Sequence, residues 1–142
     1  LGAPVGSLIV SDEKFIHRAR KLRKALGGGM RQVGILASCG QFAIDNMIER
    51  LQNDHNNAQN LAGELSYIKE IDINLQKIHT NLIFFDLNTS KITDEKFIKE
   101  LLNYEIKIDY KGNHRFRMVT HCNFDEKSIS RIITVIKKIL IK

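Results

Sequence analysis

The chain has 142 residues, of which 43% are hydrophobic and 27% charged, values ordinary for one globular domain or a piece of a larger protein. No apolar run approaches the roughly 20 residues that a membrane-spanning helix needs, so we expect no membrane partner. The net charge of +6 has its densest source at residues 18–24, but no aromatic residues interleave with these charges, so we expect a solvated helix face and no nucleic acid.

The first predicted element is a buried strand over residues 5–10, which are mostly apolar. An unpartnered strand leaves backbone hydrogen-bonding groups unpaired, so we expect this strand to pair with chain upstream of residue 1. Ser11, Asp12 and Glu13 then provide an N-cap and an acidic first turn for a helix. The apolar stripe of this helix consists of Phe15, Ile16, Ala19, Leu22 and Leu26.

A second helical pattern covers residues 32–67, which would make a helix of about 50 Å at ~1.5 Å per residue. Because that length exceeds an ordinary globular helix, we expect a bend or break at Gly34 and Gly40 or at the polar run 53–57. A long helix of this kind commonly bridges two lobes.

The second half of the chain predicts a compact α+β unit with a small, largely antiparallel sheet. Strands are expected at residues 71–75, 81–87 and 106–110, and a strand at 115–121 follows a hairpin turn at 111–113. Thr93 is expected to cap one helix, and Asn123 or Asp125 a final one. That final helix should turn Ile129, Ile132, Ile133, Ile136, Ile139 and Leu140 inward.

Three consecutive glycines, residues 27–29, separate the first two helices, with Lys24 before them and Arg31 after them. Cations around an open backbone suit a phosphate or carboxylate group, although a tight helix connection explains the glycines equally well. No metal-ligand spacing is present, so we expect no metal. None of the five histidines is assigned a catalytic role; His121 is expected to fix a loop, and His114 has no evident partner.

Cys39 and Cys122 form neither a disulfide framework nor a zinc pattern. We expect Cys39 to be a buried free thiol, which is consistent with a reducing, cytoplasmic location.

Four segments stand in a recognisable order: Leu-Gly-Ala-Pro-Val-Gly-Ser at 1–7, Arg-Lys-Ala-Leu-Gly-Gly-Gly-Met-Arg-Gln at 23–32, Thr-Asn-Leu-Ile-Phe-Phe-Asp-Leu at 80–87 and Arg-Met-Val-Thr-His at 117–121. Together they resemble the C-terminal part of the low-specificity L-threonine aldolases. These are pyridoxal-phosphate enzymes of the aspartate-aminotransferase fold type.

The resemblance implies an α/β fold, the pyridoxal-phosphate-transferase fold type I, represented by its C-terminal part. Residues 1–40 would end the large cofactor-binding domain and its sheet, residues 41–68 would form the connecting helix, and residues 69–142 the small α+β domain. The Schiff-base lysine would lie upstream of Leu1. The expected partners are therefore the N-terminal part of the same enzyme, further subunits of a homotetramer and a small amino-acid substrate, and this segment alone is expected to be inactive.

The family's reaction is the retro-aldol cleavage of L-threonine or L-allo-threonine to glycine and acetaldehyde through a pyridoxal 5'-phosphate aldimine. Arg117 resembles the arginine that binds the substrate carboxylate, Arg31 a residue near the cofactor phosphate, and Lys24 an active-site lysine other than the Schiff-base lysine. Each has a simpler interpretation: a surface arginine on an edge strand, an arginine that pairs with an acid at a helix start, and an exposed lysine in a basic run.

Two further hypotheses remain open. Another lyase of the same fold, such as a β-eliminating enzyme, would share the carboxylate arginine. A non-enzymatic basic module that binds RNA or an acidic partner would show a steep dependence of affinity on salt.

Overall fold

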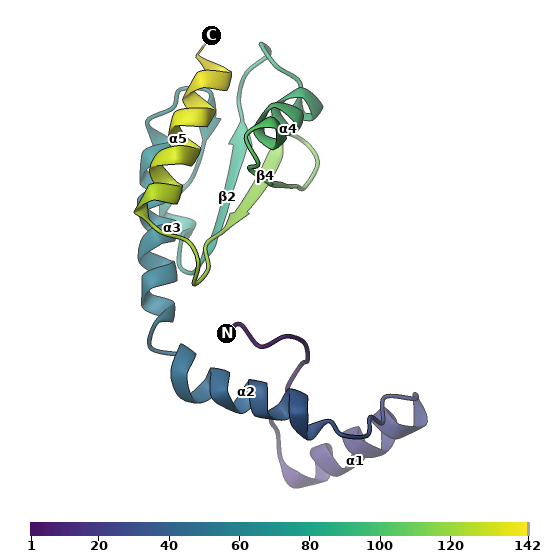
Figure 1. The fold of residues 1–142 in the computed structure, drawn as a ribbon. Coiled ribbons are helices and arrows are strands. Elements are labelled where there is room, and N and C mark those ends of the chain that lie inside the picture. The colour runs from purple at the N-terminus through teal and green to yellow at the C-terminus, as the bar shows by residue number, and fades with distance from the viewer. Residues whose placement is uncertain (142) are drawn as a thin grey trace. The chain divides into compact units, whose positions relative to one another are not determined.

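The computed structural model describes residues 1–141, which form two compact units, Leu1–Glu49 and Arg50–Lys142 (Figure 1). The domain boundaries expected at residues 40 and 68 concern a complete enzyme and stay a prediction.

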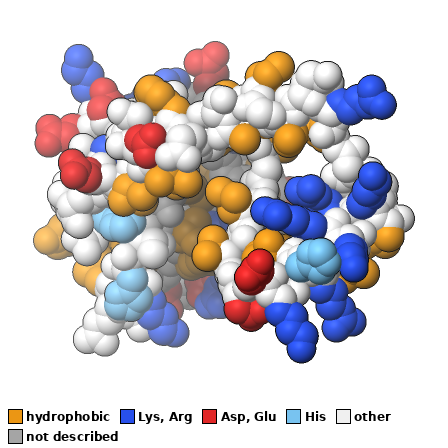
Figure 2. Space-filling view, turned by 90° about the horizontal axis from the view of Figure 1, so that it is seen from below, with side chains coloured by type: hydrophobic (Ala, Val, Ile, Leu, Met, Phe, Trp, Pro, Cys, Tyr) orange, Lys and Arg blue, Asp and Glu red, His pale blue; other side chains and the backbone are white. Residues whose placement is uncertain are grey.

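The first unit contains two helices, α1 (Glu13–Ala25) and α2 (Gly34–Met47). Asp12 is the N-cap of α1, as expected, and its carboxylate accepts a hydrogen bond of 2.8 Å from the backbone N–H of Phe15. No residue of α1 is buried within this structure, and Lys and Arg side chains gather over this helix in Figure 2.

The predicted strand at residues 5–10 does not form. All residues before α1 lack regular structure, and Val5, Leu8 and Val10 are 65%, 79% and 93% exposed. The physical reason is that a strand needs a partner for its backbone groups, and none pairs with this segment among residues 1–141. Pairing with upstream chain stays a prediction.

The predicted long helix is broken at residues 48–50, and α3 (Leu51–Ser66) follows the break. Neither expected break site is used. The polar run 53–57 stays helical, and the side chains of Asp54, Asn56 and Asn57 bond to groups other than their own backbone. Asn57, for example, donates a hydrogen bond of 2.9 Å to the carbonyl oxygen of Phe124, and Asp54 pairs with Arg50.

The second unit is a four-stranded antiparallel sheet covered on one face by α3, α4 (Asp94–Asn103) and α5 (Glu126–Leu140) (Figure 1). The strand order is β1 (Ile71–Asp72), β2 (Leu82–Leu87), β4 (Arg115–Val119) and β3 (Asp109–Tyr110). Thr93 and Asp125 cap α4 and α5 as predicted, and all the expected apolar residues of α5 are buried except the half-buried Ile132.

All four strands are shorter than predicted: β2 begins one residue later, at Leu82, and β4 ends two residues earlier, at Val119. β1 ends at Asp72, and Leu75–Lys77 forms a 3₁₀ helix because the Asn74 side chain accepts a hydrogen bond of 3.0 Å from the Gln76 N–H and starts a turn there. β3 covers only Asp109–Tyr110 of the expected 106–110.

Alternation along β2 and β4 gives the sheet two different faces. Ile83, Phe85, Phe116 and Met118 point into the core, where the Phe116 ring lies 5.6 Å from that of Phe85, centroid to centroid. The opposite residues form an open face of the sheet, composed of Phe84, Asp86, Asp109, Arg115, Arg117 and Val119. This open face carries the site described next.

Candidate functional site

Arg117 lies at the centre of the open face. It stands opposite Phe84 of β2 on one side and Asp109 of β3 on the other. Its side chain is 34% exposed. The strand pairing therefore places a guanidinium between an aromatic ring and a carboxylate, on a sheet face that no helix of this unit covers.

The guanidinium of Arg117 is only partly paired. Its Nη2 atom lies 2.6 Å from Oδ2 of Asp109, whereas its Nε is buried and has no hydrogen-bond partner among residues 1–141. Buried polar groups almost always have a partner, so the orphaned Nε is unusual and shows that the guanidinium is not saturated by partners within residues 1–141. A planar guanidinium binds a carboxylate through two parallel hydrogen bonds.

Arg117 also borders an open groove of ≈ 690 Å³. The groove is lined by residues of the segments 105–109, 117–124 and 128–132, together with Leu61. Its lining mixes apolar side chains with a similar number of polar and charged ones.

The remainder of the segment 117–121 anchors the end of β4. Thr120 is fully buried, and its hydroxyl donates a hydrogen bond of 2.6 Å to the carbonyl oxygen of Asp54 on α3. His121 accepts a hydrogen bond of 3.2 Å at Nδ1 from the Asn123 N–H, which confirms that it fixes a loop. These bonds hold the strand that carries Arg117 against the helical layer.

The three glycines of the first unit form a helix stop. Gly27 has φ +80°, and its N–H donates to the carbonyl of Lys24, while the Gly28 N–H donates to that of Arg23 at 2.7 Å. This pair of bonds is the Schellman arrangement that ends helices. A Cβ at residue 28 would lie 3.0 Å from the Arg23 carbonyl oxygen. The positive φ therefore explains Gly27, and close backbone approach explains Gly28.

Gly29 has no such explanation, because a Cβ there would meet nothing within 4 Å. Lys24 and Arg31, on either side of the glycines, are exposed and take part in none of the ion pairs found among residues 1–141. The roles assigned to Lys24, Arg31 and Arg117 from the sequence stay predictions.

The structure corrects the interpretation of His114. Its Nδ1 lies 2.9 Å from the buried carboxylate of Asp94, which also accepts a hydrogen bond of 2.8 Å from the Tyr110 hydroxyl. Burial by itself raises the pKa of Asp94, but the bonds with His114 and Tyr110 outweigh it, and the pKa lies below its ordinary value. The three side chains connect the β3–β4 hairpin to the start of α4.

Sequence reasoning missed Asp109 and Lys111. Lys111 Nζ lies 2.7 Å from the same Asp109 oxygen that contacts Arg117. The Lys111 ammonium, and after it the charge of Arg117, outweigh burial and hold the pKa of Asp109 below its ordinary value. The signal was present: a hairpin turn at 111–113 makes residues 109 and 117 neighbours across two strands.

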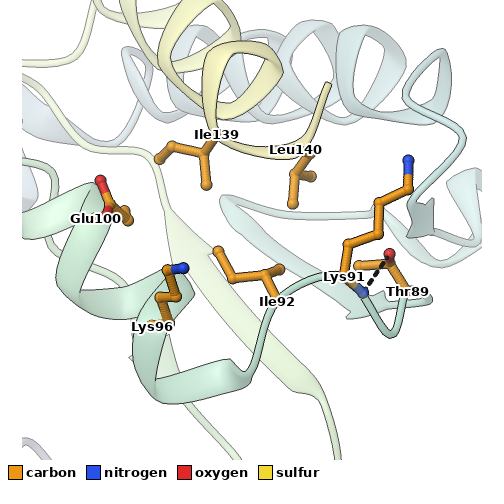
Figure 3. A pocket seen from close by; sticks show the side chains of 7 residues that line it. All are labelled: Thr89, Lys91, Ile92, Lys96, Glu100, Ile139 and Leu140. Carbon is orange, nitrogen blue, oxygen red and sulfur yellow. Dashed lines mark hydrogen bonds between the residues drawn. The ribbon is translucent and has the colours of Figure 1, made fainter. Parts of the chain in front are cut away.

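A smaller pocket of ≈ 190 Å³ lies between the segment before α4 and the end of α5 (Figure 3). Ile92, Ile139 and Leu140 point toward its centre, and the Lys91 N–H donates to the Thr89 hydroxyl at its rim. Its charged side chains, Lys91 among them, lie at the surface. We therefore assign no ligand to it.

Within residues 1–141, no group of three or more His, Cys, Asp or Glu side chains is placed to hold a metal ion. No helix along the same residues combines the length and apolar character that crossing a membrane would need. Cys39 and Cys122 are free thiols, and Cys39 is half-buried, not buried as expected.

Comparison with known proteins identifies the family. The model of the beta-eliminating lyases matches residues 1–88. The chain belongs to this family. Low-specificity L-threonine aldolase 1 of Arabidopsis thaliana is 42% identical over 122 residues, which cover 85% of this chain and 34% of that protein. Probable low-specificity L-threonine aldolase 2 of the same plant is 35% identical over 98% of this chain and 39% of its own length.

The chain thus spans little more than a third of the length of these relatives, as expected for part of a larger enzyme. Among solved structures, a C-DES mutant with glycine covalently linked to its PLP cofactor matches 72% of this chain and 27% of its own, with a TM-score of 0.60 at 15% identity. This likeness confirms the expected fold, the C-terminal part of fold type I.

Proposed function

We propose that this chain is the C-terminal part of a pyridoxal-phosphate-dependent low-specificity L-threonine aldolase, which cleaves L-threonine or L-allo-threonine to glycine and acetaldehyde. Family membership and two similar proteins named L-threonine aldolase support the proposal. In this reaction the Cα–Cβ bond breaks, the β-hydroxyl loses its proton, and Cα gains one. The residues of this chain would hold the substrate while that occurs.

The observation that carries the proposal is that the guanidinium of Arg117, on the open face, uses only part of its hydrogen-bonding capacity. Because only its Nη2 lies near a carboxylate and its side chain is 34% exposed, Arg117 retains further N–H donors for an amino-acid carboxylate. A grip on the carboxylate also restricts rotation about Cα, which orients the bond to be broken.

The residues present fit the cofactor. Arg31 is exposed and unpaired among residues 1–141, and the space around Gly29 is open, so an anion could approach the backbone there. We assign Arg31 to the cofactor phosphate. Pyridoxal phosphate, when bound, supplies the electron sink for the charge that develops at Cα. Its Schiff-base lysine would come from chain upstream of Leu1.

Lys24 is assigned a positioning role toward the substrate hydroxyl or a water. It lies in the last turn of α1, exposed, next to the glycine turn. An ammonium in this place can hold the hydroxyl by a hydrogen bond without forming a covalent link to the cofactor.

The proposed partners are the N-terminal part of the same enzyme and further copies in a homotetramer. The first unit exposes many large apolar side chains, among them Leu8, Leu26, Ile35 and Phe42 at 64–85%. Exposed apolar surface of this extent is typical of protein interfaces. The two free thiols support a cytoplasmic location.

The test is Arg117→Lys in the complete enzyme. The ammonium of lysine cannot make the two parallel hydrogen bonds that the planar guanidinium of arginine makes to a carboxylate. The KM for L-threonine should therefore rise about tenfold or more while the enzyme remains folded. Arg115→Lys is the matched control. Arg115 lies on the same strand, but its Nε and Nη2 donate hydrogen bonds of 2.8 and 2.7 Å to the two carboxylate oxygens of Asp86. An unchanged KM in Arg117→Lys contradicts the carboxylate role.

The family description favours one alternative, a β-eliminating lyase. The products from L-threonine discriminate between the two. Aldol cleavage releases glycine and acetaldehyde, whereas β-elimination of water would release ammonia and a 2-oxo acid. Detection of the 2-oxo acid in place of glycine would assign the enzyme to the eliminating class.

A further inference from the structure

The β3–β4 hairpin brings together two cations and a single carboxylate. Oδ2 of Asp109 lies 2.7 Å from Lys111 Nζ and 2.6 Å from Arg117 Nη2. One oxygen atom thus serves both cations, and the cluster keeps one positive charge in excess. Such a cluster is one anion short of neutrality.

The neighbouring arginine shows what a saturated guanidinium looks like on this sheet. Arg115 makes two hydrogen bonds to the two oxygens of Asp86. Arg117 has one close contact, through Nη2, and an orphaned Nε. On the same strand, Arg115 therefore has a carboxylate partner of its own, whereas Arg117 shares its carboxylate partner with Lys111.

We propose that Asp109 is a place-holder: in the absence of substrate, its carboxylate contacts Arg117 where the substrate carboxylate would bind. Lys111 determines how easily the substrate carboxylate displaces Asp109 from Arg117. The inference rests on the proposed function, in which Arg117 binds that carboxylate. When the substrate carboxylate binds Arg117, Asp109 stays paired with Lys111, and the two cations then face two carboxylates. Asp109 and Lys111 are positioning residues that tune affinity.

The two residues should act with opposite signs. Asp109→Asn removes a negative charge beside Arg117 and frees Nη2, so the Kd for a carboxylate ligand should fall. Lys111→Met leaves Asp109 with Arg117 alone, so the Kd should rise. Because these side chains are more than a third exposed, solvent screens the charges, and each change should be about threefold to fivefold.

The experiment is a glycine titration of the complete, cofactor-loaded enzyme by calorimetry, alongside steady-state kinetics with L-threonine. We expect Asp109→Asn to lower both the Kd for glycine and the KM for threonine with kcat unchanged, and Lys111→Met to raise both. In the double variant the effect of Lys111→Met should largely vanish, because Lys111 acts through Asp109. Asp86→Asn, which unpairs Arg115, is the control and should leave the Kd unchanged.

Two outcomes separate the inference from the proposed function. If Arg117→Ala leaves the Kd for glycine unchanged, the carboxylate role itself is wrong. If Arg117→Ala weakens binding but Asp109→Asn also weakens it, or has no effect, the place-holder role alone is wrong. Should Asp109→Asn fail to fold by circular dichroism, Lys111→Met decides, and an unchanged or lower Kd in that variant overturns the inference.

Discussion

Asp94 offers the sharpest test of how the site-bearing hairpin is held. Its carboxylate is 6% exposed and accepts hydrogen bonds at 2.8 Å from Tyr110 and 2.9 Å from His114. Asp94→Asn keeps one acceptor oxygen, which can still serve Tyr110, but it removes the charge. A hydrogen bond to a charged group contributes about 1.5–3 kcal/mol. Since His114 is largely exposed, we expect a loss of about 1–2 kcal/mol at neutral pH.

The effect should depend on pH in a defined direction. The folded-state pKa of Asp94 is lowered, so its contribution is present above the unfolded-state pKa of about 3.9. The contribution is lost as the pH falls below that value toward the folded-state pKa. The wild-type chain and the variant should therefore differ at pH 7 and converge in acid.

Urea denaturation at pH 7 and in the acid range measures this difference, with amide hydrogen exchange at β2 and β4 as the probe of the Arg50–Lys142 unit. Glu95→Gln is the matched control, because Glu95 lies in the same first turn of α4 but is exposed. The reasoning is refuted if Asp94→Asn costs no more than Glu95→Gln, or if its cost is the same at all pH values.

Two further predictions concern the first unit. Gly28→Ala should destabilise the end of α1 by about 1 kcal/mol relative to Gly29→Ala, because only the former places a Cβ against the Arg23 carbonyl oxygen. Exchange of the Gly27 amide proton, which is bonded in the same turn and present in both variants, measures this, and equal rates in both variants would contradict the turn assignment. Arg31→Ala should weaken retention of pyridoxal phosphate by the complete enzyme; equilibrium dialysis without loss of cofactor would exclude the phosphate contact.

The starts of α1, α4 and α5 could be predicted from local chemistry. Asp12, Thr93 and Asp125 were expected near the helix starts, and each accepts a hydrogen bond from the backbone three residues on. A cap acts over a few residues, so the chain needs no tertiary contact to reveal it. The same holds for the hairpin turn, whose Gly112 and Asn113 adopt positive φ of 82° and 51°.

The candidate site could be predicted only in part. The segment 117–121 pointed to Arg117, yet nothing local to that segment pointed to Lys111 or to the sharing of Asp109. Which cations a carboxylate meets depends on the register of two strands and on rotamers across them. The contact between Asp94 and His114 could not be predicted for the same reason, since 20 residues of chain separate the two.

The sequence by itself determined the order of helices and strands after residue 67, the caps and the inward face of α5, because these depend on interactions between residues close in the chain. The tertiary structure decided the break at residues 48–50, the absence of a strand at 5–10, and the charge balance around Arg117. Those features depend on which partners are available: a strand forms only beside another strand, and a guanidinium stays available only where the surrounding carboxylates leave its donors unused.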